Sequence, residues 1–259
     1  MSFVVVTEMN QVAYVKLHRP EVRNAFNPEM IAEITKTFVE LESRNDLHAV
    51  VLQGEGKVFC AGGDLNWMKE MVNFSFDQNI EDSLKLFAMF EAIAQCSLPV
   101  IGLVHGAAFG GALGLIAACD EVVAEEGTQF CFSEVKLGIA PAVISAFVNR
   151  KAVPGKVRPL MLSAAVFNAH TAQQVGLVTE VVPAGEGHTV LQKVLHNYSQ
   201  CGPEAVRETK KLLNSLNSMT WDQQKKATAK VIAERRASPE GQEGLKSFLE
   251  KREPTWRPQ

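Results

Sequence analysis

Short apolar runs rich in β-branched residues alternate with longer amphipathic segments through the first two thirds of the chain. The first two runs form a hairpin of alternating pattern, and the later ones have the continuous apolar character of buried strands. The pattern predicts strands at residues 3–7, 12–17, 49–53, 98–104, 121–124, 129–132 and 178–182.

Apolar residues spaced three and four positions apart predict helices over residues 28–43, 83–95, 154–163 and 169–175. The first of these helices starts well, because Asn27 precedes a proline at the first helical position. Its apolar face is expected to contain Met30, Ile31, Ile34, Phe38 and Leu41.

Residues 68–82 have little periodicity, and we expect a mobile connection there. From residue 188 onward the pattern is helical, with breaks at residues 202–203 and 238–239. The sequence therefore predicts an α/β protein in which a strand-containing core, residues 1–185, is followed by a helical part, residues 186–259.

Two of the expected strands run into glycine turns that precede a helix. The strand at 98–104 leads to Gly110-Gly111, and the strand at 49–53 leads to Gly62-Gly63 before a helix from Asp64. Glycine lets a ligand approach the backbone, and the first N–H groups of a helix have no acceptor within it. The turns are candidates for the two halves of an oxyanion hole. The alternative is that small residues only let a buried helix pack closely on the sheet.

At these positions the chain resembles the crotonase family, also called the enoyl-CoA hydratase/isomerase superfamily. The resemblance extends over almost the whole chain, through His18-Arg19-Pro20 and residues 23–27, 59–65, 105–120, 129–134, 137–138, 172–178 and 243–252. It implies a crotonase-like ββα spiral core over residues 1–185. It also implies a helical trimerisation region over residues 186–259, and hence a homotrimer or a hexamer made of two trimers. The implied substrate is an acyl-CoA thioester, with no cofactor other than the coenzyme A that the substrate carries.

The resemblance assigns the two oxyanion donors to the N–H groups of Gly63 and Gly111, and the general acid/base to Glu134. Glu134 follows an expected strand among apolar residues, where burial would raise the pKa of its carboxyl group. Outside this framework it would more often be a solvated or salt-bridged residue. Hydratases of the family usually carry another glutamate three residues after the oxyanion glycine, where this chain has Gly114. The missing carboxylate would leave space for a branched or carboxylated acyl group.

The family positions that contact coenzyme A fall on the loop before the first long helix, on the first glycine turn and on the last helix. They correspond to Val22, Arg23, Ala61, Gly63, Asp64, Leu65, Phe248 and Lys251. The side chain of Asp64 has the alternative role of capping the helix that follows it. For Phe248 and Lys251 the alternative is ordinary packing and solvation on a terminal helix.

Residues 110–115 and 137–145 look like the bacterial branch of the family that acts on methylglutaconyl-CoA or the related carboxygeranoyl-CoA. We therefore expect reversible hydration of a 2-enoyl-CoA thioester, branched or carboxylated, such as 3-methylglutaconyl-CoA. Two alternatives stay open. A Δ3,Δ2-enoyl-CoA isomerase needs only one glutamate, and Gly114 also permits a non-catalytic acyl-CoA binding protein.

Composition limits the other partners. The net charge of -3 and scattered Lys and Arg residues give no basic field for nucleic acid or anionic lipid. The histidines lack metal-ligand spacing, and the five cysteines contain no CxxC pair, so we expect no metal and reduced thiols. No basic region precedes the first apolar run, and no apolar stretch reaches about 18 residues. These features predict a cytoplasmic protein without a signal peptide or a membrane span.

Overall fold

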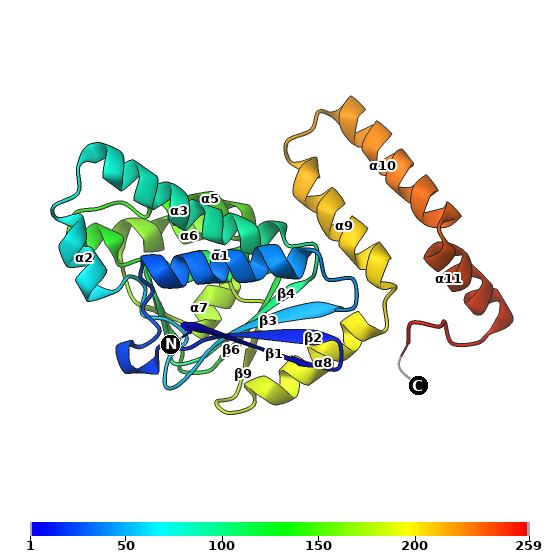
Figure 1. The fold of residues 1–259 in the computed structure, drawn as a ribbon, viewed down its shortest axis with the longest axis horizontal. Helices are drawn as coiled ribbons and strands as arrows, with labels where there is room; N and C mark the ends of the chain where they lie inside the picture. The colour runs from blue at the N-terminus through cyan, green and yellow to red at the C-terminus, as the bar shows by residue number, and fades with distance from the viewer. Residues whose placement is uncertain (1, 258–259) are drawn as a thin grey trace.

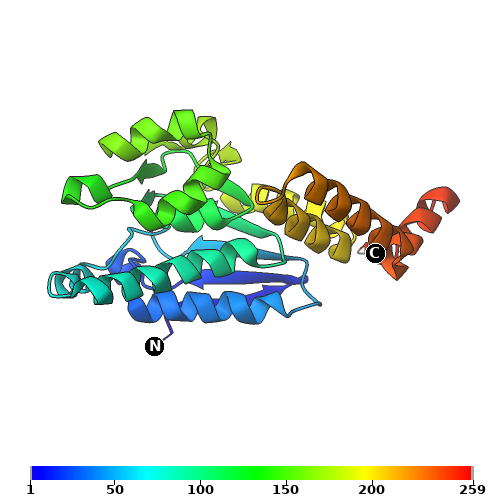
Figure 2. The same ribbon diagram turned by 90° about the horizontal axis from the view of Figure 1, so that it is seen from above.

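The computed structural model describes residues 2–257; residues 1, 258 and 259, which belong to the two expected parts of the chain, lie outside the described range. In that range, two sheets and their covering helices form an α/β core, and a helical extension follows it (Figure 1). The extension consists of α9 (Pro203–Leu216), α10 (Trp221–Ala237) and α11 (Pro239–Glu250). Figure 2 shows that these helices extend away from the core and give the molecule an elongated outline.

The main sheet has six strands, and every neighbouring pair is parallel except the N-terminal hairpin. In spatial order these strands are β1 (Val4–Met9), β2 (Val12–Leu17), β3 (Ala49–Gly54), β4 (Val100–Val104), β6 (Glu121–Glu125) and β9 (Glu180–Val182). A small second sheet contains β5 (Ala107–Phe109), β7 (Gln129–Cys131) and β8 (Phe167–Asn168). The strands expected from the apolar runs are therefore confirmed, with shifted ends.

The helices of the core cover the sheets and fill the crossovers between parallel strands. They are α1 (Pro28–Glu42), α2 (Leu65–Met71), α3 (Phe76–Gln95), α4 (Ala112–Ala118), α5 (Ala142–Lys151), α6 (Pro154–Ser163), α7 (Ala169–Gln174) and α8 (Gly187–Ser199), with 3-10 turns η1 (Pro20–Val22) and η2 (Glu134–Leu137). The expected start of α1 is confirmed, because the Asn27 side chain accepts a hydrogen bond from the Met30 N–H at 3.0 Å. The five apolar residues expected on its inner face are all buried.

Residues 68–82, expected to form a mobile connection, are helical over most of their length. α2 continues to Met71, and α3 already begins at Phe76, where Ser75 and Gln78 form a capping box. The first turns of α3 lack an amphipathic period because the apolar side chains of Phe76, Ile80 and Leu84 are exposed, while polar side chains line a cavity. This inverted pattern does not predict an amphipathic helix.

The helical C-terminal part starts with a helix that belongs to the packing of the core. Leu191, Val194 and Leu195 of α8 are buried in one cluster with residues of the main sheet. The expected breaks are confirmed, since α9 begins at Pro203 and α11 at Pro239. A further break, between α9 and α10, was not predicted. None of the helices within residues 2–257 combines the length and the hydropathy that crossing a membrane requires.

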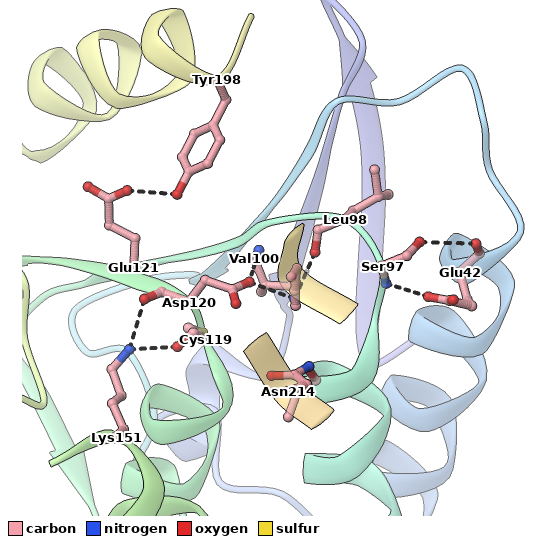
Figure 3. A network of polar contacts seen from close by, with 12 residues as sticks. Glu42, Ser97, Leu98, Val100, Cys119, Asp120, Glu121, Lys151, Tyr198 and Asn214 are labelled. Atoms are coloured by element: carbon pink, nitrogen blue, oxygen red, sulfur yellow. Dashed lines mark hydrogen bonds and ion pairs between the residues drawn. The ribbon is translucent and has the colours of Figure 1, made fainter. Parts of the chain in front are cut away.

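An ion pair between a buried lysine and a partly exposed aspartate connects the extension to the core. Lys210 of α9, 8% exposed, donates from Nζ to the Leu98 carbonyl at 2.8 Å and to Asp120 Oδ2 at 2.6 Å. The same carboxylate oxygen accepts a hydrogen bond from the Val100 N–H at 2.7 Å. Figure 3 shows Asp120 beside Val100, with Lys151 reaching the carbonyl oxygens of Cys119 and Asp120. The end of α4, the start of β4 and the extension therefore meet at one carboxylate.

Replacing Lys210 with methionine is expected to lower the free energy of unfolding by about 2 kcal/mol, because the Leu98 carbonyl and the partly exposed Asp120 carboxylate lose a charged hydrogen-bond donor. Urea denaturation followed by circular dichroism measures this change. Lys211→Met is the matched control, since the neighbouring side chain is 77% exposed and its ion pair contributes little. Equal stability of the two variants would contradict the structural importance of the pair between Lys210 and Asp120.

Candidate active site

Gly63, Gly111 and Glu134, which the sequence places far apart, line one cavity of about 600 Å³. The rest of its wall is mostly apolar and comes from α2, α3 and residues 137–144. A larger groove of about 880 Å³ lies between α9 and the ends of α4 and α5, and its lining contains none of the predicted site residues. The smaller cavity is therefore the candidate active site.

The first glycine turn is held by the backbone of Phe26. The Phe26 N–H donates to the Gly62 carbonyl at 2.8 Å, and the Asp64 N–H donates to the Phe26 carbonyl at 3.0 Å. Gly62 has a φ of +91°, and a Cβ atom there would lie 2.7 Å from the Phe109 carbonyl oxygen. Within the described residues the Gly63 N–H donates to no protein acceptor, so this group is free for a ligand.

Asp64 fixes the same turn from its other side. Its Oδ2 accepts a hydrogen bond from Arg19 Nη2 at 2.9 Å, and its Oδ1 accepts one from the Asn66 N–H at 2.7 Å, which caps α2. Burial raises the pKa of the Asp64 carboxyl group, but these donors outweigh it and leave the pKa below its ordinary value. The capping alternative for Asp64 is therefore confirmed. Arg19 of the His18-Arg19-Pro20 motif thus helps to hold this turn, a role that the motif alone does not reveal.

The second glycine turn carries the other free donor. Gly110 has a φ of +54°, and its N–H donates to the Cys131 carbonyl at 2.8 Å. Gly111 then forms the N-cap of α4, and its N–H finds no protein acceptor in the part of the chain that the structure describes. A Cβ atom on Gly111 would lie 2.4 Å from the Phe26 ring. Phe26 thus holds one turn with its backbone and packs against the other with its ring.

Glu134 begins η2 directly beside the second turn. A Cβ atom on Gly110 would lie 3.6 Å from Glu134 Oε1. The other carboxylate oxygen, Oε2, is buried and has no hydrogen-bond partner among the described residues. Burial raises the pKa of the Glu134 carboxyl group above its ordinary value. A partly buried carboxylate with a free oxygen, in the same cavity as two free N–H donors, is suited to moving a proton beside a developing oxyanion.

The raised pKa of Glu134 predicts that Glu134→Gln is more stable than the wild type at neutral pH. The folded state holds the proton more tightly than the unfolded state, so wild-type stability falls as the pH rises from the unfolded pKa through the folded pKa. The glutamine amide does not ionise, so the variant does not lose this stability. Thermal melts should give a higher Tm for the variant at about pH 7.5, and the difference should become small at about pH 4, where the Glu134 carboxyl group is mostly protonated in both the folded and the unfolded state. A difference that does not change with pH would contradict this prediction.

The expectation that Gly114 opens space for an acyl group is wrong. A Cβ atom on Gly114 would lie 2.6 Å from Phe90 Cζ and 2.8 Å from Ile144 Cγ2. Both of these side chains are buried. Gly114 does not line the cavity, and the space beside it belongs to the core between α3, α4 and α5.

The predicted coenzyme A positions separate into two groups. Val22, Arg23, Ala61 and Leu65 surround the first glycine turn, and the Ala61 N–H donates to the Arg23 carbonyl at 3.0 Å. Arg23 adopts a left-handed φ of +58°, and the Leu65 side chain is 75% exposed.

Phe248 and Lys251 belong to the end of α11, which lies at the opposite end of the molecule from α2 (Figure 1). A single protomer therefore does not bring the two groups together.

Sequence reasoning also missed the polar residues that α3 presents to the cavity. Asn79, Asp82 and Ser83 line it, and Asp82 accepts a hydrogen bond from the indole N–H of Trp67 at 3.2 Å. Their spacing of three and four residues is the signal that identifies one helix face. This spacing identifies a helix face only if residues 68–82 are taken as helical, and the sequence pattern did not predict a helix there.

Comparison with known proteins identifies the family to which the chain belongs. The model of the enoyl-CoA hydratase/isomerase family matches residues 7–259, and the chain belongs to this family. The Alternaria alternata enoyl-CoA hydratase ACTT6 is 32% identical over 90% of this chain and 77% of that protein. An enoyl-CoA hydratase of known structure from Shewanella pealeana is 36% identical, with a TM-score of 0.93 over 98% of this chain and 96% of that one.

The structure of Pseudomonas aeruginosa AtuE has a TM-score of 0.96 and 30% identity, over 99% of this chain and the whole of that one. The expected crotonase fold is thereby confirmed.

Proposed function

We propose that this family member catalyses the reversible addition of water to a 2-enoyl-CoA thioester. The observation that carries the proposal is the buried, unpartnered oxygen of Glu134 in the cavity that the Gly63 and Gly111 N–H groups also line. A thioester carbonyl bound between these donors becomes negatively charged when a nucleophile attacks its conjugated β-carbon. Glu134 is then the group that delivers a proton to the α-carbon, and it removes that proton in the reverse direction.

We propose a branched or carboxylated acyl group, such as 3-methylglutaconyl. The support is that the segment resembling that branch of the family forms one wall of the cavity, from Leu137 to Ile144. Among the described residues that line the cavity, none is Lys, Arg or His, so an acyl carboxylate would rely on neutral donors within one protomer. A direct comparison of carboxylated and uncharged substrates therefore tests the acyl group.

An isomerase is the second candidate function, because the position of the family's other glutamate is closed by Phe90 and Ile144. One carboxylate suffices to move a proton between two carbons. The discriminating assay offers purified protein crotonyl-CoA, 3-methylglutaconyl-CoA and a 3-enoyl-CoA, follows the conjugated thioester absorbance and determines product masses. Gain of one water supports the hydratase. Reaction of the 3-enoyl substrate alone, without a mass change, supports the isomerase, and binding without turnover supports an acyl-CoA binding protein.

We also propose that the extension forms contacts between copies of the chain, as a trimer or a dimer of trimers. Its three helices expose large apolar side chains, which a monomer in water would leave uncovered. They are Leu213, Trp221, Ile232, Leu245, Phe248 and Leu249. In such an assembly α11 of one copy is available to the coenzyme A site of another, which would unite the two groups of predicted contacts. Analytical ultracentrifugation tests the oligomeric state.

A further inference from the structure

One face of α3 brings a second carboxylate into the candidate active site. Asn79, Asp82, Ser83 and Leu86 line the cavity, and their spacing places them on the same side of the helix. Three of these four side chains are polar, in a wall that is otherwise mostly apolar. Asp82 is the only carboxylate besides Glu134 among the described residues that line the cavity.

The orientation of Asp82 is coupled to the first oxyanion turn through Trp67. The Trp67 side chain is only 4% exposed and donates its indole N–H to Asp82 Oδ1. The other edge of the same indole packs against Gly63, where a Cβ atom would lie 3.6 Å from Trp67 Cζ3. A rigid aromatic ring thus separates the Asp82 carboxylate from the Gly63 backbone.

The second oxygen of Asp82 is open for a ligand, since Oδ2 makes no hydrogen bond within residues 2–257. Burial raises the pKa of the Asp82 carboxyl group. The charged groups nearest to it on α3 are Lys85 and Glu81, which pair with each other at 2.8 Å, and Glu134 shares its cavity. Among residues 2–257, Asp82 therefore has no ion-pair partner of its own.

Hydration needs two proton movements, because water loses a proton as it attacks the β-carbon and the α-carbon gains one. Two carboxyl groups with different pKa values can each carry out one of these proton transfers. The position on α4 that would supply the second one is Gly114, and Phe90 and Ile144 fill its surroundings. No carboxylate fits there without displacing the core.

We infer that Asp82 is the second catalytic carboxylate of the hydration reaction proposed above. Its free oxygen accepts a hydrogen bond from the attacking water and takes one proton from it, while the water oxygen forms the new bond to the β-carbon. The π electrons of the double bond move to the α-carbon, which takes the proton from protonated Glu134. Transfer of a proton from Asp82 through solvent to Glu134 restores the starting state, so the net change is the addition of one water.

Asp82→Asn tests the inference because it keeps the size of the side chain and an acceptor for Trp67. The hydration rate should fall by about 100-fold or more. Exchange of the α-protons of butyryl-CoA with deuterated solvent requires only Glu134 and the oxyanion donors, and this exchange should continue at the wild-type rate. Asp82→Glu should restore part of the hydration activity. Asp77→Asn, the same change at an exposed position of α3, is the control and should retain both reactions.

The outcomes separate this inference from the function on which it rests. Wild-type hydration rates in Asp82→Asn would overturn the role of Asp82 and leave the hydratase intact. A parallel loss of hydration and of exchange would also overturn it, because the change would then act through Glu134 or the fold. If the wild type hydrates no 2-enoyl-CoA, the proposed function fails and the inference falls with it. Asp82→Ser provides the same test if the asparagine variant does not fold.

Discussion

Glu134→Gln is expected to lower the hydration rate by about 10³-fold, within the range that removal of a general acid/base produces. The glutamine keeps the shape of the side chain beside Gly110 but has no carboxyl proton to exchange with the α-carbon. Both oxyanion donors and the loops around the first glycine turn stay in place, so the dissociation constant of an acyl-CoA should stay close to the wild-type value. Steady-state kinetics and isothermal titration calorimetry measure the two effects separately.

Glu126→Gln is a suitable control, because Glu126 is exposed and outside the cavity, with the His170 Nε2 atom 3.8 Å from its carboxylate. It should retain the wild-type rate. A Glu134→Gln enzyme that turns over normally would exclude Glu134 as the acid/base. Loss of acyl-CoA binding together with turnover would instead indicate that the carboxylate holds the substrate.

Gly114→Glu is expected to destabilise the fold by about 3 kcal/mol or more, and not to create the two-glutamate arrangement of other hydratases. The added side chain would collide with Phe90 and Ile144 and would bring a carboxylate into an apolar part of the core. Chemical denaturation gives the loss of stability, and the hydration assay shows whether any activity is gained.

Two comparisons isolate the steric cause. Gly155→Glu adds the same side chain in the first turn of α6, where a Cβ atom meets nothing within 4 Å, and should change stability little. Phe90→Leu removes the ring atom nearest to Gly114 and should make Gly114→Ala less destabilising than it is in the wild type. An active, stable Gly114→Glu variant would show that the core can open at this point.

The sequence pattern was sufficient to predict an element where the residues that start or cap the element lie within the same segment. Asn27-Pro28 and the apolar face behind it predict α1, and the prolines at positions 203 and 239 mark the starts of α9 and α11. The sequence likewise predicted both glycine turns and the position of Glu134 after a strand. Their roles as donors and acid/base stay predictions until the kinetic variants are measured.

The sequence by itself determined the α/β core, the helical C-terminal part and the family, because short-range periodicity, caps and motifs depend on neighbouring residues. Only the tertiary structure decided what surrounds Gly114, since Phe90 and Ile144 reach it from two other helices. It also placed Asp82 in the cavity and paired Arg19 with Asp64 across 45 positions of sequence. These contacts depend on how separate elements pack. The hydrophobic periodicity of one segment does not reveal which distant segment it contacts.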